Sequence, residues 1–156
     1  MATLQFSEAR DCVLREVRAR RVRSSPERVA LQDCAGRVLA EDIQADRDYP
    51  PLARSVRDGF AVRAADFPGK VRLIGEVRAG DRFQGSVKVG EAVEIMTGAP
   101  VPDGADAIIM VEHVRRDGDV ITTDRPVNGG DFINPQGCES PQGSVVLRAG
   151  MRLDYA

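Results

Sequence analysis

Apolar residues near the N-terminus recur with the spacing of one helical face. The pattern i, i+3, i+4 and i+7 is typical of an amphipathic helix, and five residues follow it: Phe6, Ala9, Val13, Leu14 and Val17. The sequence therefore predicts a helix over residues 6–22, with Ser7 as its N-cap. Asp11–Arg15 and Glu16–Arg20 are spaced i,i+4 in the favourable order, and residues 24–26 end the pattern.

From residue 28 onward, the pattern changes to short β-rich segments separated by Gly, Pro and Asp. Eight segments are predicted strands: 28–31, 38–43, 60–63, 71–77, 92–96, 107–112, 120–123 and 144–147. Asp117-Gly118 predicts a hairpin, and the Gly- and Pro-containing stretch 128–143 predicts a long loop. Many short strands with frequent turns indicate a mainly β body, sandwich-like or barrel-like, behind one N-terminal α-helix.

Composition narrows the class of protein. The 156 residues suffice for one domain or two small ones, and 42% of them are hydrophobic, so a core can form. A net charge of −2, with acids and bases interspersed, argues against nucleic acid as a partner. Three widely spaced cysteines (Cys12, Cys34 and Cys138) argue against a zinc site or a disulfide framework. Without a signal peptide or a membrane-spanning apolar run, we expect a cytoplasmic protein and no membrane partner.

Two turn regions offer candidate chemistry, and each leaves two interpretations open. In SVRDGFAVRAAD, Asp58 is either a functional carboxylate or a turn residue that caps its own backbone. In EIMTGAPVPDGADAIIMVE, the Thr97 hydroxyl and nearby N–H groups can hold an anion, and Gly98 lets a ligand approach the backbone closely. The same string also fits a rigid Pro-rich connection with a solvated threonine.

A third turn reads GCESPQG. Glu139 there is either a metal or substrate ligand or an exposed carboxylate, and Cys138 either a thiol ligand or an incidental cysteine. Together with Thr97, the acids Asp58, Asp106 and Glu139 are compatible with a magnesium–phosphate site, and equally with no site. His113, at the end of a predicted strand, is more typical of a surface residue than of a ligand.

The same strings resemble a known family. SVRDGFAVRAAD resembles the S-x-x-DG-[YF]-AVR-x-x-D motif of the molybdopterin molybdotransferases, which include the bacterial MoeA proteins and the E domain of gephyrin. IMTGAPVPDGADAIIMVE resembles the second motif of that family, in the same order and at a matching separation. The flanking strings LQDCAGRVLAEDI and GGDFINPQGCESPQGSVVLRAGMRL also resemble segments of the family. The chain as a whole is therefore similar to the N-terminal region of these proteins.

The resemblance implies a domain organisation. Residues 1–27 would form a helix and linker, residues 28–46 with 135–156 a dimer-forming domain, and residues 47–134 an inserted β domain. Both sub-domains would be bifurcated or coiled β-sheet. Family members continue into an α/β domain, against which the N-terminal helix packs, and a small C-terminal β domain. The active-site cleft lies between the α/β domain of one subunit and the β domain of the other. We therefore expect a partial chain that is inactive alone.

The resemblance also implies a reaction. The family inserts molybdate into adenylylated molybdopterin with release of AMP, and Mg²⁺ is the expected cofactor. By resemblance, Asp58 and Thr97 are catalytic, Asp58 is also a metal ligand, and Ser55, Gly98 and Glu139 contact the cofactor. Many members carry an acidic GED-type sequence where this chain has Gly137-Cys138-Glu139. The expected partners are a second copy, giving a homodimer, and the molybdopterin adenylyltransferase of the same pathway. The alternative function is a non-catalytic dimerisation or scaffold module.

Overall fold

The computed structural model describes residues 4–20 and 25–155. The chain divides into two compact units: residues 1–40 with 150–156, and residues 41–149. Each unit is defined by contacts within a single chain, so the predicted dimer-forming role of the terminal segments stays a prediction.

The predicted N-terminal helix is present as α1, Phe6–Ala19. Its N-cap is Gln5 and not Ser7, because the carboxylate of Glu8 reaches back to accept the Gln5 N–H at 3.0 Å and fixes the first turn there. The expected Glu16–Arg20 ion pair forms at 3.8 Å. Asp11, however, pairs with its neighbour Arg10. The predicted continuation to residue 22 falls partly outside the described residues.

The rest of the first unit contains little regular structure. The predicted strand 28–31 is wrong, because Leu31 begins a 3-10 turn, η1 (Leu31–Asp33), which is closed by hydrogen bonds to the carbonyls of residues 30 and 31. The predicted strand 38–43 is reduced to an isolated bridge between Val38 and Arg152, with β1 (Ile43–Gln44) in the second unit. These segments remain short because their apolar side chains have no covering layer; Leu31 is 84% exposed.

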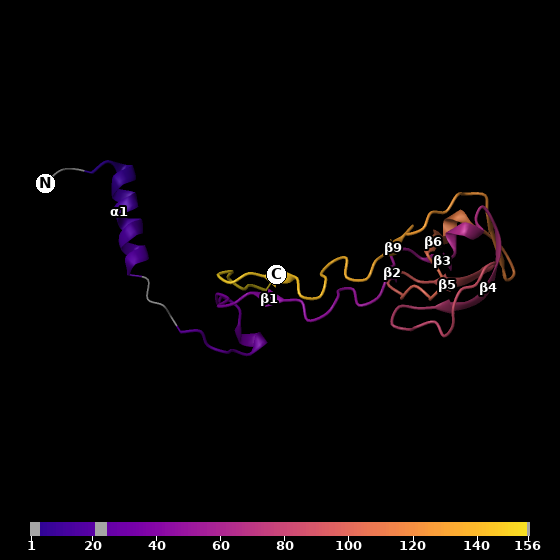
Figure 1. The fold of residues 1–156 in the computed structure, drawn as a ribbon, viewed down its shortest axis with the longest axis horizontal. Coiled ribbons are helices and arrows are strands. Elements are labelled where there is room, and N and C mark those ends of the chain that lie inside the picture. Colours follow the sequence, from indigo (N-terminus) through magenta and orange to yellow (C-terminus); the bar gives the residue numbers. More distant parts are fainter. Residues whose placement is uncertain (1–3, 21–24, 156) are drawn as a thin grey trace. The chain divides into compact units, whose positions relative to one another are not determined.

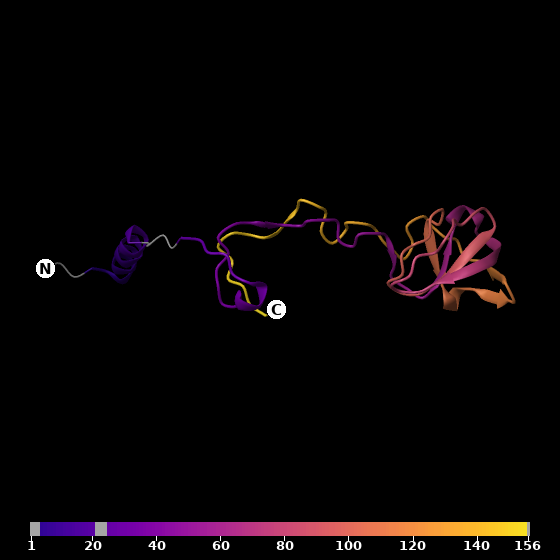
Figure 2. The ribbon, with the colours of Figure 1, turned by 90° about the horizontal axis from the view of Figure 1, so that it is seen from below.

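The second unit contains a two-segment antiparallel arm made of residues 41–58 and 132–149, which run side by side in both views (Figures 1 and 2). β1 pairs with β10 (Val145–Leu147), and β2 (Arg54–Ser55) pairs with β9 (Ile133–Asn134). Between these pairs, the Asp48 carboxylate accepts the Gln142 N–H and the Gln136 amide at 2.8 Å each. These bonds lower the pKa of Asp48, because they stabilise its charged form.

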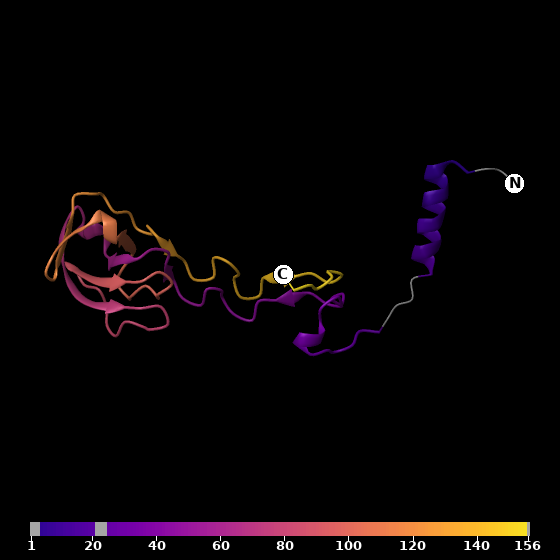
Figure 3. The ribbon, with the colours of Figure 1, turned by 180° about the vertical axis from the view of Figure 1, so that it is seen from behind.

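The arm leads into a β-sheet (Figure 3). The sheet has six strands in the order β6-β3-β5-β4-β8-β7. Its strands are β3 (Gly59–Val62), β4 (Gly69–Val77), β5 (Glu91–Ile95), β6 (Ala107–Met110), β7 (Arg115–Asp117) and β8 (Val120–Thr123). Neighbouring strands are antiparallel except β4 and β5, which are parallel. Short 3-10 turns, η2 (Ala64–Asp66) and η3 (Val111–His113), follow β3 and β6.

Five predicted strands of the sheet are confirmed within one or two residues, and the Asp117-Gly118 hairpin joins β7 to β8 as predicted. The predicted strand 107–112 ends early at Met110, because the chain turns into η3. The pattern missed β2, β7 and β9, which have three residues or fewer. The predicted fold class, mainly β with one N-terminal helix, is confirmed.

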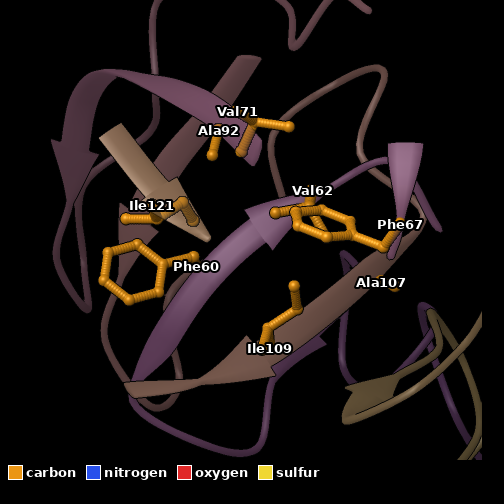
Figure 4. Close-up of a cluster of buried hydrophobic side chains, with 8 residues drawn as sticks. All are labelled: Phe60, Val62, Phe67, Val71, Ala92, Ala107, Ile109 and Ile121. Carbon is orange, nitrogen blue, oxygen red and sulfur yellow. The ribbon is translucent and has the colours of Figure 1, made fainter. Parts of the chain in front are cut away.

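The core lies on both faces of the sheet because alternate side chains of a strand point to opposite sides. One cluster contains Phe60, Val62, Phe67, Val71, Ala92, Ala107, Ile109 and Ile121, as Figure 4 shows. The other contains Ala61, Val77, Val87, Val93, Ile95, Ala99 and Ile108. All four residues of β3 are buried. The loops at its ends are therefore attached to the most firmly packed part of the unit.

Candidate functional site

Asp58 and Thr97, from the two motifs, lie together at one end of the sheet. Asp58 immediately precedes β3, Thr97 follows β5 by two residues, and the antiparallel register pairs Gly59 with Ile95. The Thr97 backbone N–H donates to Asp58 Oδ1 at 2.7 Å, and the Thr97 hydroxyl donates to the same oxygen at 2.8 Å. The register of the buried strands thus joins two residues that are 39 positions apart.

A platform of three short segments supports this pair: residues 53–55, residues 98–101 and β9. The Ser55 N–H donates to the Ala99 carbonyl at 3.0 Å, and the Gly98 N–H donates to the Ser55 carbonyl at 2.8 Å. On the other side, β2 pairs with β9. The loops that carry Asp58 and Thr97 are therefore fixed by backbone hydrogen bonds as well as by their own contact.

The platform also determines what Ser55 and Gly98 can do. Ser55 is only 2% exposed, and its hydroxyl donates to the Arg57 carbonyl at 2.5 Å, so this side chain shapes the turn before Asp58. Gly98 has a φ of +82°, which favours glycine at this position. Its N–H is already bonded to Ser55.

The N–H and O–H groups expected to hold an anion are engaged within the chain. Both donors of Thr97 bind Asp58, and the Gly98 N–H binds Ser55. Thr97 therefore orients the Asp58 carboxylate, and what it retains for a ligand is the acceptor capacity of its hydroxyl oxygen. The sequence predicts Asp58 and Thr97 at one site, but it carries no signal that they pair with each other.

The Thr97 backbone N–H, and then the Thr97 hydroxyl, lower the pKa of Asp58 because both stabilise its charged form. A carboxyl group whose pKa is lower in the folded chain stabilises the fold above its unfolded pKa of about 3.9. This contribution is lost as the pH falls through the lower folded value. Asp58 is exposed, and no described residue hydrogen-bonds its Oδ2 atom. At neutral pH the site therefore presents an ionised, oriented and accessible carboxylate.

The other two acids of the magnesium hypothesis lie elsewhere in the unit. Asp106 precedes Ala107, which pairs with Val62 at the opposite end of β3, and its carboxylate accepts the Ala64 N–H at 2.6 Å. Glu139 lies on the arm, where its N–H donates to the Tyr49 carbonyl. Within the described residues these three acids form no common cluster, so the structure favours the alternative in which a single chain has no three-acid site.

Within residues 4–20 and 25–155, no group of three or more His, Cys, Asp or Glu side chains is arranged to hold a metal ion. At the Asp58–Thr97 pair, both hydrogen bonds from Thr97 go to Asp58 Oδ1, which leaves the Oδ2 atom of the same carboxylate for a metal ion. That fits Mg²⁺, which commonly takes one or two protein carboxylates and completes its shell with waters and substrate phosphates.

Around Glu139, the structure reveals a contact that sequence reasoning missed. The Asn134 amide nitrogen donates to Glu139 Oε1 at 3.2 Å, and the Cys138 thiol contacts Asn134 Oδ1 at 2.8 Å. No sequence signal marks Asn134, because it lies in a strand of two residues without a periodic pattern. His113, in η3, lines a shallow surface depression with Arg115 and Asp124, which are ion-paired at 3.1 Å.

The described part of the chain has no helix that is both long and apolar enough to cross a bilayer. Two features define the class of protein. One helix precedes a curled β unit, and within that unit two motifs that are distant in sequence meet at an Asp–Thr pair. Residues 4–156 match the family model described as the MoeA N-terminal region (domain I and II). The chain belongs to this family, which confirms the resemblance.

Named relatives agree. The chain is 36% identical over 158 residues to a molybdopterin molybdenumtransferase of Synechococcus elongatus, covering 96% of this chain and 39% of the relative. It is 38% identical over 136 residues to the Bacillus subtilis protein of the same name, covering 80% of this chain and 32% of the relative. The chain thus spans less than two fifths of the length of these two relatives.

Solved structures agree as well. A molybdopterin biosynthesis MoeA protein from Pyrococcus horikoshii OT3 superposes with a TM-score of 0.79 at 42% identity, over 83% of this chain and 36% of that one. A second MoeA structure from the same genus superposes with a TM-score of 0.82 at 33% identity, over 93% and 39%.

Proposed function

We propose that this chain is the N-terminal part of a molybdopterin molybdotransferase, which inserts molybdate into adenylylated molybdopterin and releases AMP. The observation that carries the proposal is the Asp58–Thr97 pair. The two motifs that resemble this family meet there through hydrogen bonds of 2.7 and 2.8 Å. The names of the relatives support the same reaction class.

In this reaction a phosphoanhydride is cleaved, so the site must manage negative charge on phosphate oxygens. Asp58, held ionised and oriented by Thr97, positions the attacking oxygen or would hold Mg²⁺ through Oδ2. Bound Mg²⁺ would supply charge neutralisation at the phosphates. Positioning and electrostatic stabilisation account for most of the catalysis in reactions of this kind. Ser55 and Gly98 contribute by fixing the two loops.

Glu139 is proposed as a second contact with the substrate. Its carboxylate is exposed and accepts one hydrogen bond from Asn134. Because two anions repel, it suits N–H or O–H donors of the substrate better than its phosphates. This assignment places Glu139 with the pterin or ribose part of the ligand, and Asp58 with the reacting phosphates.

Two partners follow from the proposal, and both act in the cytoplasm. One is a second copy of the chain, because the family cleft combines two subunits. The other is the adenylyltransferase that makes the adenylylated substrate. Light scattering over a dilution series tests the first: a persistent dimer supports a dimer-forming role for the terminal segments. A monomer at every concentration contradicts that role for the isolated chain.

A non-catalytic dimerisation module is the second candidate. The chain spans only 39% and 32% of two relatives, and Leu31, Val38, Val146 and Met151 expose apolar side chains. Under this alternative, the segment associates with a copy or partner and has no turnover of its own. The isolated chain is expected to be inactive under both candidates, so activity must be measured in the enzyme that carries it.

The test is the Asp58→Asn substitution in that enzyme, with release of AMP from adenylylated molybdopterin as the readout. We expect a loss in kcat on the order of 10²-fold, comparable with removing one preorganised electrostatic group, and an unchanged circular dichroism spectrum. Asp117→Asn, at an exposed aspartate of β7, is the matched control and should keep full activity. Unchanged turnover in Asp58→Asn would remove the proposed role of this carboxylate.

A further inference from the structure

Asn134 connects the arm to the platform beneath Asp58. As the last residue of β9, it pairs with Arg54 of β2. Arg54 also forms a bridge to Pro100, on the segment that follows Thr97. The backbone of Asn134 is therefore fixed in register with both loops of the candidate site. Its side chain is partly buried and reaches back over the turn of residues 135–139.

The chemistry of its neighbours determines which way the Asn134 amide faces. An ionised carboxylate only accepts hydrogen bonds, so the NH₂ group must face Glu139, as it does at 3.2 Å. The amide oxygen then faces Cys138, at 2.8 Å from the sulfur. A thiol supplies the donor that this oxygen requires. The three side chains thus form a chain of donors that runs from Cys138 through Asn134 to Glu139.

We propose that Asn134 is a positioning residue, which orients the Glu139 carboxylate and is itself oriented by the Cys138 thiol. The inference rests on the proposed function, which gives Glu139 its contact with the substrate. The Gly137-Cys138-Glu139 sequence supports this role. The GED-type sequence of many family members has an acid where this chain has Cys138, and an ionised acid has no hydrogen to donate to the amide oxygen. In this chain, a thiol at that position completes the arrangement.

The geometry can be tested in the 156-residue chain without any activity. Asn128 and Asn134 are its two asparagines, so selective ¹⁵N-asparagine labelling gives two side-chain NH₂ groups in an NMR spectrum. We expect Glu139→Gln to shift the Asn134 resonances and leave those of Asn128 unchanged. Cys138→Ser, which keeps a donor, should preserve the Asn134 resonances better than Cys138→Ala. Glu112→Gln, at an exposed glutamate of η3, is the matched control.

If the Asn134 resonances respond to Glu139→Gln no more than to Glu112→Gln, the contact does not exist in solution and the proposal fails. The same holds if Cys138→Ser and Cys138→Ala change them equally. Both readouts report on the amide itself, so a general loss of stability cannot imitate them.

The functional test is a double-mutant cycle in the enzyme that carries this chain. Asn134→Ala should lower kcat about 10- to 100-fold, as expected for losing one hydrogen bond to a charged group. Adding Asn134→Ala to Glu139→Gln should cause no further loss, because the residue acts through Glu139. Independent losses that multiply would refute the positioning role. If the unsubstituted enzyme releases no AMP, the proposed function fails, whereas the NMR result still decides whether the amide orients Glu139.

Discussion

Gly59 offers a strong test of how the fold holds the candidate site. It stands directly after Asp58, at the start of β3, where β3 and the edge strand β6 approach closely. A Cβ atom added at Gly59 would lie 2.0 Å from the Ile109 carbonyl oxygen and 2.9 Å from its carbon. Since carbon and oxygen atoms approach to about 3.3 Å at closest, Gly59→Ala must separate the two strands by more than about 1 Å.

The cost follows from what such a movement breaks. The Val111 N–H donates to the Asp58 carbonyl at 3.2 Å, and a further 1 Å takes this bond beyond the usual hydrogen-bond range. Losing one or two ladder bonds costs about 0.5–1.5 kcal/mol each, and overpacking against backbone adds about 1–3 kcal/mol. We expect Gly59→Ala to lower the free energy of unfolding by about 1.5–6 kcal/mol.

The assay is urea unfolding of the 156-residue chain followed by far-UV circular dichroism, because the chain has no Trp and only two Tyr. Gly129→Ala is the matched control: a Cβ there meets nothing within 4 Å, and its φ is not in the left-handed region. It should change stability by less than about 0.5 kcal/mol. If Gly59→Ala is as stable as Gly129→Ala, the close approach of β3 and β6 is wrong.

Two further outcomes follow from the structure. Thr97→Val removes the hydroxyl donor, so the pKa of Asp58 should rise toward its ordinary value in an NMR titration of the carboxyl carbon. Thr122→Val, in β8, should leave this pKa unchanged. If both variants give the same Asp58 pKa, the hydrogen bond between Thr97 and Asp58 is contradicted. Ile121→Ala removes a fully buried side chain and should cost about 2–5 kcal/mol in urea unfolding, whereas Val120→Ala, at a partly exposed position, should cost less than about 1 kcal/mol. Equal losses of stability at these two positions would contradict the arrangement in which Ile121 of β8 points into the core and Val120 points toward solvent.

Local signals were sufficient where a segment is long or carries a specific turn. The apolar face of α1, the β-rich runs of β4, β5 and β8, and the Asp117-Gly118 hairpin were predictable because each depends on neighbours in sequence. Shorter elements were not predictable. β2, β7 and β9 have two or three residues each, too few to show a periodic pattern. β2 and β9 pair with each other across a long stretch of sequence, whereas β7 pairs with the adjacent β8.

By itself, the sequence determined the class of fold, the helix, most strands of the sheet, and the motifs that place the chain in its family. The tertiary structure decided which candidates meet. Antiparallel pairing of β3 with β5 brings Thr97 to Asp58, whereas the pairing of β3 with β6 places Asp106 at the opposite end of β3. The physical reason is that strand and turn preferences are local, whereas register depends on burying both faces of β3 against chain that is distant in sequence. The Asn134 contacts, likewise, arise only from the pairing of β9 with β2 and the turn that follows.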